Sequence, residues 1–316
     1  MSRFSIVIPI DGDDRRQNEI QRFEDTLASV LRSRPSESQI IVVHNGRYED
    51  PHGLGSEVDW IVETSPYLAD QLDRGLKAAT GDLITLLRPG IELDEGWNES
   101  VPKAFENKSV GSLTPLIVST SYPAKITVGG ILANRSGTRL LAGFQKKFSH
   151  RTLRNLKPLG PSSHFGIYRR SVLKAIGPAG SLTEDLYVDV DIALSMRELG
   201  FTSALGSDVI GTTESEDLII AESTRPHGCS AERSLSRYSQ ADSSPTSPTL
   251  SRTLWEIAKA PLKPWLFRHG FQRLSAKRHR ALDQAFRQHL AAAKNTPSWR
   301  DSATESESKT SRRRAA

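Results

Sequence analysis

The sequence LADQLDRGLKAATGDLITLL, residues 68–87, contains a helical pattern followed directly by a strand pattern. A stripe of apolar residues recurs in it at helical spacing: Leu68, Leu72, Leu76 and Ala79. Gly81 follows, and glycine commonly lies just beyond the last turn of a helix. The run Leu83–Leu87 then has the length and composition of a buried strand. The segment therefore predicts one helix and one strand of an α/β fold.

The same alternation extends towards the amino terminus. Phe4–Pro9 (FSIVIP), Gln39–Val43 (QIIVV) and Val58–Val62 have the composition of buried strands. Between the first two of them, apolar residues again recur at helical spacing: Phe23, Leu27, Val30 and Leu31. Strands that alternate with helices predict a mostly parallel sheet with helices on both faces.

The second half of the chain has a weaker pattern. Residues 110–160 contain short strand-like runs at Leu116–Ser119 and Lys125–Val128, separated by basic loops. Beyond them, the sequence predicts a strand at His164–Tyr168, a helix over residues 185–199 and a closing strand at Thr202–Leu205.

Composition divides the chain into four parts. Residues 1–240 contain the alternating pattern and are predicted to form one domain. Residues 241–251 are rich in serine, threonine and proline, as is typical of a linker. Residues 252–295 predict basic amphipathic helices, and residues 296–316 predict a disordered tail because they contain few apolar side chains.

Charge is distributed unequally between these parts. Residues 251–316 hold 15 Lys and Arg against 5 Asp and Glu, a net charge of +10, whereas residues 1–250 carry −5. Trp265 and Phe267 lie among the cations of this basic segment, which suits the boundary of an anionic membrane. The alternative is that its helices pack on the domain. We expect peripheral association with the inner face of the membrane and no nucleic-acid partner, because the segment has no recognisable nucleic-acid motif.

Several protein classes are excluded by composition. No apolar run approaches the roughly 18 residues that cross a bilayer, and the acidic residues after Ile10 differ from a secretory signal. Cys229 is the only cysteine, so neither an internal disulfide nor a cysteine zinc site is expected. These features predict a cytoplasmic protein.

Four segments together resemble the family 2 glycosyltransferases, which are inverting enzymes with a GT-A fold. The resemblance covers roughly residues 3–238 and depends on the order and spacing of the segments. They are FSIVIPIDGDD (4–14), QIIVVHNGRYED (39–50), the opening segment at 68–87, and GIYRRSVLKAIG (166–177) with VDVDIALSMRELGF (188–201). The resemblance implies a GT-A-like nucleotide-sugar-binding domain, followed here by a C-terminal helical extension.

The resemblance also implies where a nucleotide sugar would bind. A nucleoside diphosphate would lie at the carboxyl ends of the first strands, with Pro9, Asp11, Asn45 and Asp73 at the nucleotide site. The acidic residue that pairs with the base in the family aligns with His44 and Asn45. Asn45 offers a donor and an acceptor to a uracil edge. The alternatives are an ordinary Asn-Gly turn at Asn45 and a solvated turn at Asp11.

The chain departs from the family at Arg88-Pro89-Gly90. Relatives carry a pair of aspartates there, which hold a divalent cation across the diphosphate. A guanidinium does not bind Mg²⁺ or Mn²⁺, so we expect no metal cofactor. Arg88 instead suits the diphosphate itself and is assigned to stabilise the departing nucleotide. Two alternatives are a surface Arg88 in an inactive site and a displaced acidic site at Glu92 and Asp94.

The general base of the family is an aspartate at the start of a late helix. The resemblance assigns this role to Asp191, with Val190 in place of the preceding glutamate. Such a carboxylate removes the proton of the acceptor hydroxyl as it attacks the anomeric carbon. The alternative for the neighbouring Glu184, Asp185 and Asp189 is structural: they lie near a helix start, where negative charge is favourable.

Two functions remain open from the sequence. One is an inverting glycosyltransferase that moves a sugar from a nucleoside-diphosphate sugar to a glycan or lipid-linked acceptor. The other is a non-catalytic relative that binds nucleotide sugar, glycan or a partner enzyme. The loss of the acidic pair favours the second function, whereas Arg88 and Asp191 favour the first.

Overall fold

The computed structural model describes residues 3–10, 18–65, 67–133, 139–177 and 187–214, together with the single residues 219, 288, 291 and 292. Asp11 and the predicted linker at 241–251 lie outside the described residues, as do the predicted basic helices and tail apart from three of those single residues. Within the described part of the chain, no helix has the length and apolar character needed to cross a membrane.

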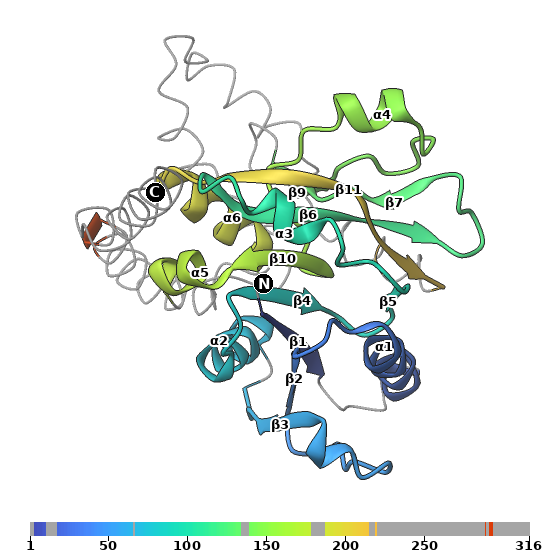
Figure 1. The fold of residues 1–316 in the computed structure, drawn as a ribbon, viewed down its shortest axis with the longest axis vertical. Helices are drawn as coiled ribbons and strands as arrows, with labels where there is room; N and C mark the ends of the chain where they lie inside the picture. Colours follow the sequence, from blue (N-terminus) through green and yellow to red (C-terminus); the bar gives the residue numbers. More distant parts are fainter. Residues whose placement is uncertain are drawn as a thin grey trace, which may run out of the picture.

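The first half of the chain alternates strands and helices as the sequence predicts (Figure 1). Its elements are β1 (Phe4–Ile10), α1 (Glu19–Ser33), β2 (Gln39–His44), the 3-10 helix η1 (Leu54–Ser56), β3 (Val58–Val62), α2 (Leu68–Ala78) and β4 (Leu83–Leu87). β1 pairs in parallel with both β2 and β4, and β2 pairs in parallel with β3. The prediction that the strands at Phe4, Gln39 and Leu83 lie side by side in one sheet is confirmed.

A glycine brings α2 unusually close to this sheet. A β-carbon at Gly75 would lie 2.5 Å from Cγ1 of Val7 and 3.3 Å from Cγ2 of Val43. Any larger residue would therefore push the helix away from β1 and β2.

The second half contains shorter elements and two long strands. They are β5 (Glu92–Leu93), α3 (Val101–Ala104), β6 (Val110–Ser119), β7 (Ile126–Val128), β8 (Ile131–Ala133), β9 (Arg139–Leu141), α4 (His150–Asn155), β10 (Phe165–Arg169), α5 (Arg170–Ile176), α6 (Val188–Glu198) and β11 (Thr202–Thr213). The sequence prediction was too short for both long strands. The start of β6 pairs with β10 and β11, and β11 continues past Leu205 through a register shift between Gly206 and Ile210. Pairing with distant strands, which local composition does not encode, sets these lengths.

Most strands of the main sheet run in one direction. The order is β3-β2-β1-β4-β10-β6-β11-β5, with β7 paired to β6. Among the nine strands that the described residues place in this sheet, β10, β5 and β7 oppose the other six. The fold is therefore α/β with a mostly parallel sheet, as the sequence predicts.

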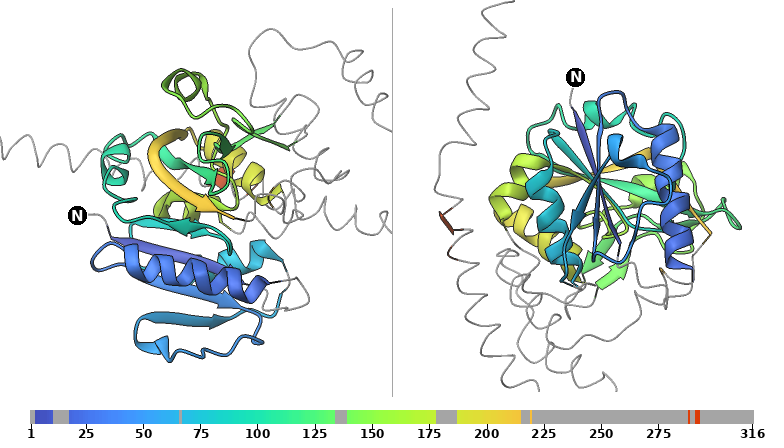
Figure 2. Two further views of the ribbon diagram at one scale, coloured as in Figure 1. Left: turned by 90° about the vertical axis from the view of Figure 1, so that its right-hand side faces the viewer. Right: turned by 90° about the horizontal axis from the view of Figure 1, so that it is seen from below.

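The sheet curls because a short connection joins its centre to its edge. β4 and β5 are four strand positions apart, which would be roughly 19 Å in a flat sheet. The five peptide units from Leu87 to Glu92 span at most roughly 17 Å when fully extended, and they contain a tight turn in which the Ile91 N–H donates to the Arg88 carbonyl at 3.3 Å. The second half of the sheet must therefore bend back over the first, and Figure 2 shows the curved β11 that results.

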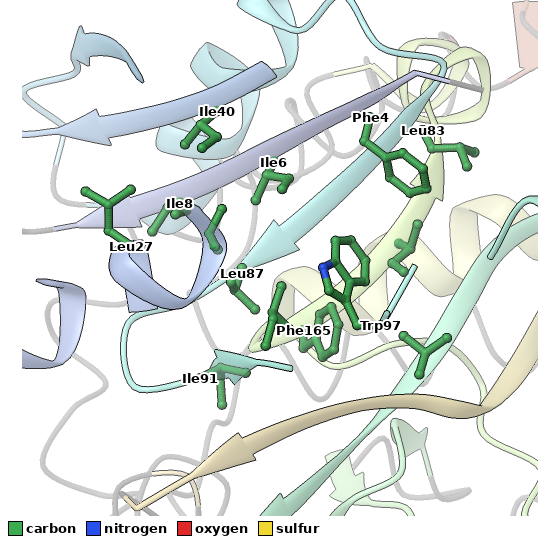
Figure 3. Close-up of a cluster of buried hydrophobic side chains, with 14 of the residues drawn as sticks. Phe4, Ile6, Ile8, Leu27, Ile40, Leu83, Leu87, Ile91, Trp97 and Phe165 are labelled. Atoms are coloured by element: carbon green, nitrogen blue, oxygen red, sulfur yellow. The ribbon is translucent and has the colours of Figure 1, made fainter. Parts of the chain in front are cut away.

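The helices lie on both faces of the sheet. In the right-hand view of Figure 2, α1 lies on one side of the strands, and α2, α5 and α6 lie on the other. The larger buried cluster fills the α1 side and the inside of the curl (Figure 3); it includes Phe4, Ile6, Ile8, Leu27, Leu87, Ile91, Trp97 and Phe165. Trp97 packs edge-on against Phe4 and Phe165, with ring centroids 5.8 and 6.2 Å apart, and its Nε1–H donates to the Ser33 carbonyl at 3.2 Å.

Trp97→Ala should lower the free energy of unfolding by about 3–5 kcal/mol, because it empties the inside of the curl and leaves the Ser33 carbonyl without this donor. Urea denaturation measures the change. Tyr67→Ala is the matched control, since Tyr67 is 58% exposed and its loss should cost no more than about 0.5 kcal/mol. Similar losses in both variants would show that Trp97 does not anchor the curl.

Candidate active site

The direction of the strand connections changes between β1 and β4. The connection through α1 leads from β1 to β2 on one side, and the connection through α2 leads from β3 back past β1 to β4 on the other. In open α/β sheets, ligands bind outside the carboxyl ends of the strands at such a switch point. The carboxyl end of β1 and the residues that follow β2 and β4 therefore form the candidate active site.

A tight turn follows β4 at this edge. Pro89 and Gly90 occupy its central positions, with Gly90 at φ +92°, as a type II turn requires. The Gly90 N–H donates to the Thr26 hydroxyl at 2.9 Å and to the Arg22 carbonyl at 3.3 Å, so the turn is fixed to α1. Arg88 begins the turn and is partly exposed. The chain thus forms a rigid turn after β4 that begins with a cation.

A second segment lies beside Arg88 because β10 runs antiparallel to β4. The Arg88 N–H donates to the His164 carbonyl at 2.9 Å, and the neighbouring Ser163 N–H donates to Oδ2 of Asp189 at 2.9 Å. Asp189 is in the first turn of α6. One backbone hydrogen bond and one bond from a backbone N–H to a carboxylate therefore connect the turn after β4 to the start of α6.

Arg139 holds the Asp189 carboxylate in a buried ion pair. Its Nε lies 3.0 and 3.1 Å from Oδ1 and Oδ2, and its Nη2 lies 2.7 Å from Oδ2. The Arg139 side chain is 1% exposed and that of Asp189 is fully buried. Such two-point geometry fixes both partners, and each charge depends on the other for compensation.

The hairpin that carries Arg139 also holds the segment beside Arg88. In β8, the Ile131 N–H donates to the Gly160 carbonyl at 2.9 Å, and the Ile131 carbonyl accepts from the Leu159 N–H at 2.7 Å. The segment 159–164 is therefore bonded to β8 at one end and to α6 and Arg88 at the other.

Asp191 lies two residues after Asp189 in α6. Only 1% of it is exposed, and its carbonyl accepts a hydrogen bond from the Ser195 hydroxyl at 2.6 Å. Hydrogen bonds at His164 and Ser163 connect the Arg88 turn to Asp189, which precedes Asp191 by two residues in the same helix.

The residues predicted to contact the base follow β2. Oδ1 of Asn45 accepts from the Arg47 N–H at 3.0 Å, as in an ordinary side-chain-stabilised turn, and Asn45 is partly exposed. His44 is 8% exposed and packs edge-on against Trp60 at 6.0 Å. Burial lowers the pKa of His44, so its imidazole is neutral at pH 7 and offers one donor and one acceptor. Pro9 is buried in β1 beside Val43, at the same edge.

Asp73 lies in α2. It lines a cavity of about 50 Å³ between α2, α5 and α6, together with apolar residues that include Leu72, Leu173 and Ile192. Burial raises the pKa of Asp73 to about 6, with a smaller opposing effect from Lys77 and a further increase from Asp70. The cavity is also lined by Val7 of β1 and by Ile84 and Leu86 of β4, and neither Asn45 nor Pro9 is among its lining residues.

The side chains at the turn do not suit a divalent cation. Arg88, Pro89 and Gly90 provide no carboxylate, and Glu92 is in β5, paired with β11. Burial raises the pKa of the Glu92 carboxyl, as do the negative charges of Asp25, Glu214 and Asp94, while Arg32 opposes them. Within the ranges that the structure describes, no three His, Cys, Asp or Glu side chains group in a way that could hold a metal ion.

Sequence reasoning missed Arg139 and Ser163, and interpreted Asp189 only as part of a helix start. Arg139 is 50 residues from its partner, and it lies in a basic region where an exposed cation is the usual expectation. The sequence of the helix does indicate that a counter-charge is needed. Asp189 and Asp191 interrupt an otherwise apolar segment, and buried charges require partners.

Sequence comparison gives no relatives for this chain: no protein-family model matches it, and no curated protein matches it significantly. Among solved structures, the fold is similar to the crystal structure of GalNAc-T7 with UDP, GalNAc and Mn²⁺, with a TM-score of 0.53 and 13% identity over 67% of this chain. The match covers 44% of the GalNAc-T7 chain, so the present chain spans less than half of that structure.

Two further solved structures are similar at lower scores. The mannosyltransferase PcManGT from Pyrobaculum calidifontis, in complex with GDP-Man and Mn²⁺, has a TM-score of 0.47 and 14% identity over 92% of this chain and 86% of its own. Residues 1–349 of S. aureus TarS have a TM-score of 0.43 and 12% identity, and the match covers 76% of this chain and 71% of the TarS chain. The fold is that of the GT-A glycosyltransferases, and at these identities the likeness concerns the fold alone.

Arg139→Met should lower the free energy of unfolding by about 3–5 kcal/mol, because it leaves the buried Asp189 carboxylate without its counter-charge. Arg139→Met with Asp189→Leu should recover much of that loss, since an apolar pair removes both charges. Urea denaturation compares these variants with Arg34→Met, which breaks the exposed pair with Glu57 and should cost no more than about 1 kcal/mol. A loss as small as that in Arg34→Met would contradict the structural role of the pair.

The buried Asp73 should make stability depend on pH. Its pKa is about 6 in the fold against a usual value of 3.8, so the folded protein binds the proton more tightly. Stability should therefore decrease as pH rises from about 4 to about 6 and then level off. Asp73→Asn should remove this decrease, and thermal unfolding across that range measures it, with Asp94→Asn at an exposed position as control. A difference between wild type and Asp73→Asn that stays constant with pH would refute the assignment.

Proposed function

We propose that this protein is a glycosyltransferase that moves a sugar from a nucleoside-diphosphate sugar to a glycan or lipid-linked acceptor. The observation that carries the proposal is the placement of Arg88 at the switch point of a GT-A fold, where a diphosphate would lie. In this proposal, the transfer is a single inverting displacement that needs no divalent cation. A UDP-sugar is the first donor to test, because the similar GalNAc-T7 structure contains UDP and GalNAc.

Arg88 has the role of a fixed cation in the proposed reaction. As the bond to the sugar breaks, negative charge grows on the departing diphosphate, and a guanidinium held in place stabilises that charge without reorganisation. The support for this role is the rigidity of its backbone, which is bonded to His164 and fixed through Gly90 to α1.

Two carboxylates in α6 compete for the role of general base. Both oxygens of Asp189 already accept hydrogen bonds from Arg139, and Oδ2 accepts a further one from Ser163. We therefore propose Asp191 as the base and Asp189 as the residue that positions the segment beside Arg88. Because Asp191 is 1% exposed, this role requires that substrate binding opens a path to its carboxylate.

Arg88→Ala should slow turnover by about 10² to 10³, with a smaller effect on nucleotide affinity, because it removes one preorganised donor from the transition state. Arg88→Lys keeps the charge without the forked geometry and should recover part of the rate. The measurement is sugar transfer or donor hydrolysis from UDP-sugars, with and without chelator, alongside calorimetric binding of UDP.

Asp191→Asn should abolish transfer while the fold and UDP affinity stay nearly unchanged, and Asp189→Asn is the comparison that separates the two carboxylates. Loss of activity with chelator and recovery with Mn²⁺ would overturn the role of Arg88 and favour Glu92 or Asp94. Failure of the wild-type chain to bind any nucleotide sugar would overturn the enzyme proposal as a whole.

A further inference from the structure

One long segment of the domain contains no acidic residue. Between residues 107 and 183 there are twelve Lys and Arg and no Asp or Glu. The remainder of residues 1–250 carries a net charge of −17. The positive charge of this segment cannot be neutralised within it, so the question is where its cations lie in the fold.

Several of these cations lie on one two-stranded ribbon beyond the end of β6, in which residues 124–126 pair with residues 146–148. Lys125 and Lys147 face each other in an antiparallel bridge. The Ile126 N–H donates to the Lys146 carbonyl at 2.9 Å, and the Phe148 N–H donates to the Ala124 carbonyl at 2.8 Å. The ribbon thus holds the backbones of these three lysines close together.

Helix α4 continues the same surface. Ser149, which follows the ribbon, caps α4 by accepting from the Thr152 N–H at 3.3 Å. Six cations are exposed on the ribbon, α4 and the residues just after it: Lys125, Lys146, Lys147, Arg151, Arg154 and Lys157. We call these six residues the basic surface.

The basic surface lies at the same edge of the sheet as the candidate active site. β6 runs in the direction of β4, since both pair antiparallel with β10. Ile167 is level with Thr85 in β4 and with Leu113 in β6, so β6 continues several residues further past this edge than β4 does. The ribbon begins where β6 ends, and Figure 1 shows β7 and α4 together at that side.

A short backbone path joins the basic surface to the buried ion pair. Arg139 begins β9, and the Ala142 N–H that follows β9 donates to the Gly130 carbonyl at 2.9 Å. The Gln145 N–H then donates to the Ile126 carbonyl at 2.9 Å, at the start of the ribbon. The hairpin of β8 and β9 therefore holds Asp189 through Arg139, and it is bonded to the lysine-bearing ribbon through the residues that follow β9.

Two aromatic side chains are exposed in this region. Tyr122 is 60% exposed and Phe144 is 37% exposed, and Nζ of Lys125 lies 5.7 Å from the Tyr122 ring centroid. Aromatic rings separated by cations provide apolar faces for the C–H groups of sugar rings and charges for their acidic substituents.

We propose that the basic surface binds the acceptor, and that the acceptor is an oligosaccharide bearing carboxylate or phosphate groups. The acceptor role rests on the proposed function, whereas binding of an anionic oligosaccharide does not. A saccharide chain is favoured over a membrane because the cations follow a narrow ribbon that leads to the active-site edge, where a reacting hydroxyl must arrive.

The test uses the full chain and fluorescein-labelled oligogalacturonate, with an uncharged maltooligosaccharide of equal length as the neutral probe. The variant carries Lys146→Gln, Lys147→Gln, Arg151→Gln and Arg154→Gln. The control removes the same charge from exposed positions on α2, α5 and α6 through Arg74→Gln, Lys77→Gln, Lys174→Gln and Arg197→Gln. These helices lie on the left in Figure 1, whereas β7 and α4 lie on the right. Thermal unfolding confirms that both proteins are folded.

The basic-surface variant should bind oligogalacturonate at least about tenfold more weakly at low salt, with a smaller difference at high salt because surface charges are screened. The control variant should bind like wild type, and the neutral probe should not distinguish the three proteins. The proposal is overturned if the variant binds as tightly as wild type, or if the control loses as much affinity, since net charge alone would then explain binding.

Two further arms separate other partners. Vesicles of phosphatidylglycerol and a single-stranded oligonucleotide are bound to the same proteins. Loss of vesicle or oligonucleotide binding in the variant, with oligogalacturonate binding unchanged, would replace the saccharide by a membrane or nucleic acid. Calorimetric binding of UDP to wild type is measured separately, so a failed donor site and a failed acceptor surface give different results.

Discussion

The four residues from Arg88 to Ile91 impose the constraint on which the rest of the structure depends. They connect β4 at the centre of the sheet to β5 at its edge, a distance that a flat sheet would not allow. The curl that results encloses Trp97 and Phe165 and brings β11 over the first half of the domain. The same turn starts with Arg88, so the requirement that closes the sheet also fixes the position of the candidate catalytic cation.

The first half of the fold could be predicted from sequence because each element there has a local signal. β1, β2 and β4 are continuous apolar runs of buried parallel strands, and α1 and α2 carry apolar stripes at helical spacing. The second half lacks such signals. The first half of β6 contains the polar residues Ser112 and Thr114, which become strand residues through pairing with β10 and β11. Their hydroxyls both contact the Ser203 hydroxyl at 2.9 Å.

A residue of the candidate site could be predicted only where its type and its place at the end of a recognisable strand together indicate a role. Arg88 could be singled out because it follows a recognisable strand. The Arg139–Asp189 pair was not, since it joins residues 50 positions apart and neither has a local pattern that requires the other. Asp73 illustrates a different limit: its helix was correctly placed, but the sequence did not indicate that Asp73 lines the cavity between α2, α5 and α6. Which part of a helix reaches the strand ends depends on packing, which the sequence motif does not state.

Electrostatics link the turn to the basic surface. Arg88 places a positive charge at the edge of the sheet, and Arg139 compensates the charge of Asp189 in the segment beside it. The field at this edge therefore becomes more positive just where the acid-free segment adds exposed cations. A site that holds its donor by carboxylates and a bound cation would repel an anionic acceptor until the metal arrived. In the proposed arrangement, fixed guanidinium and ammonium groups attract the donor diphosphate and an anionic acceptor alike. Arg88 and the basic surface would therefore serve the same pair of substrates.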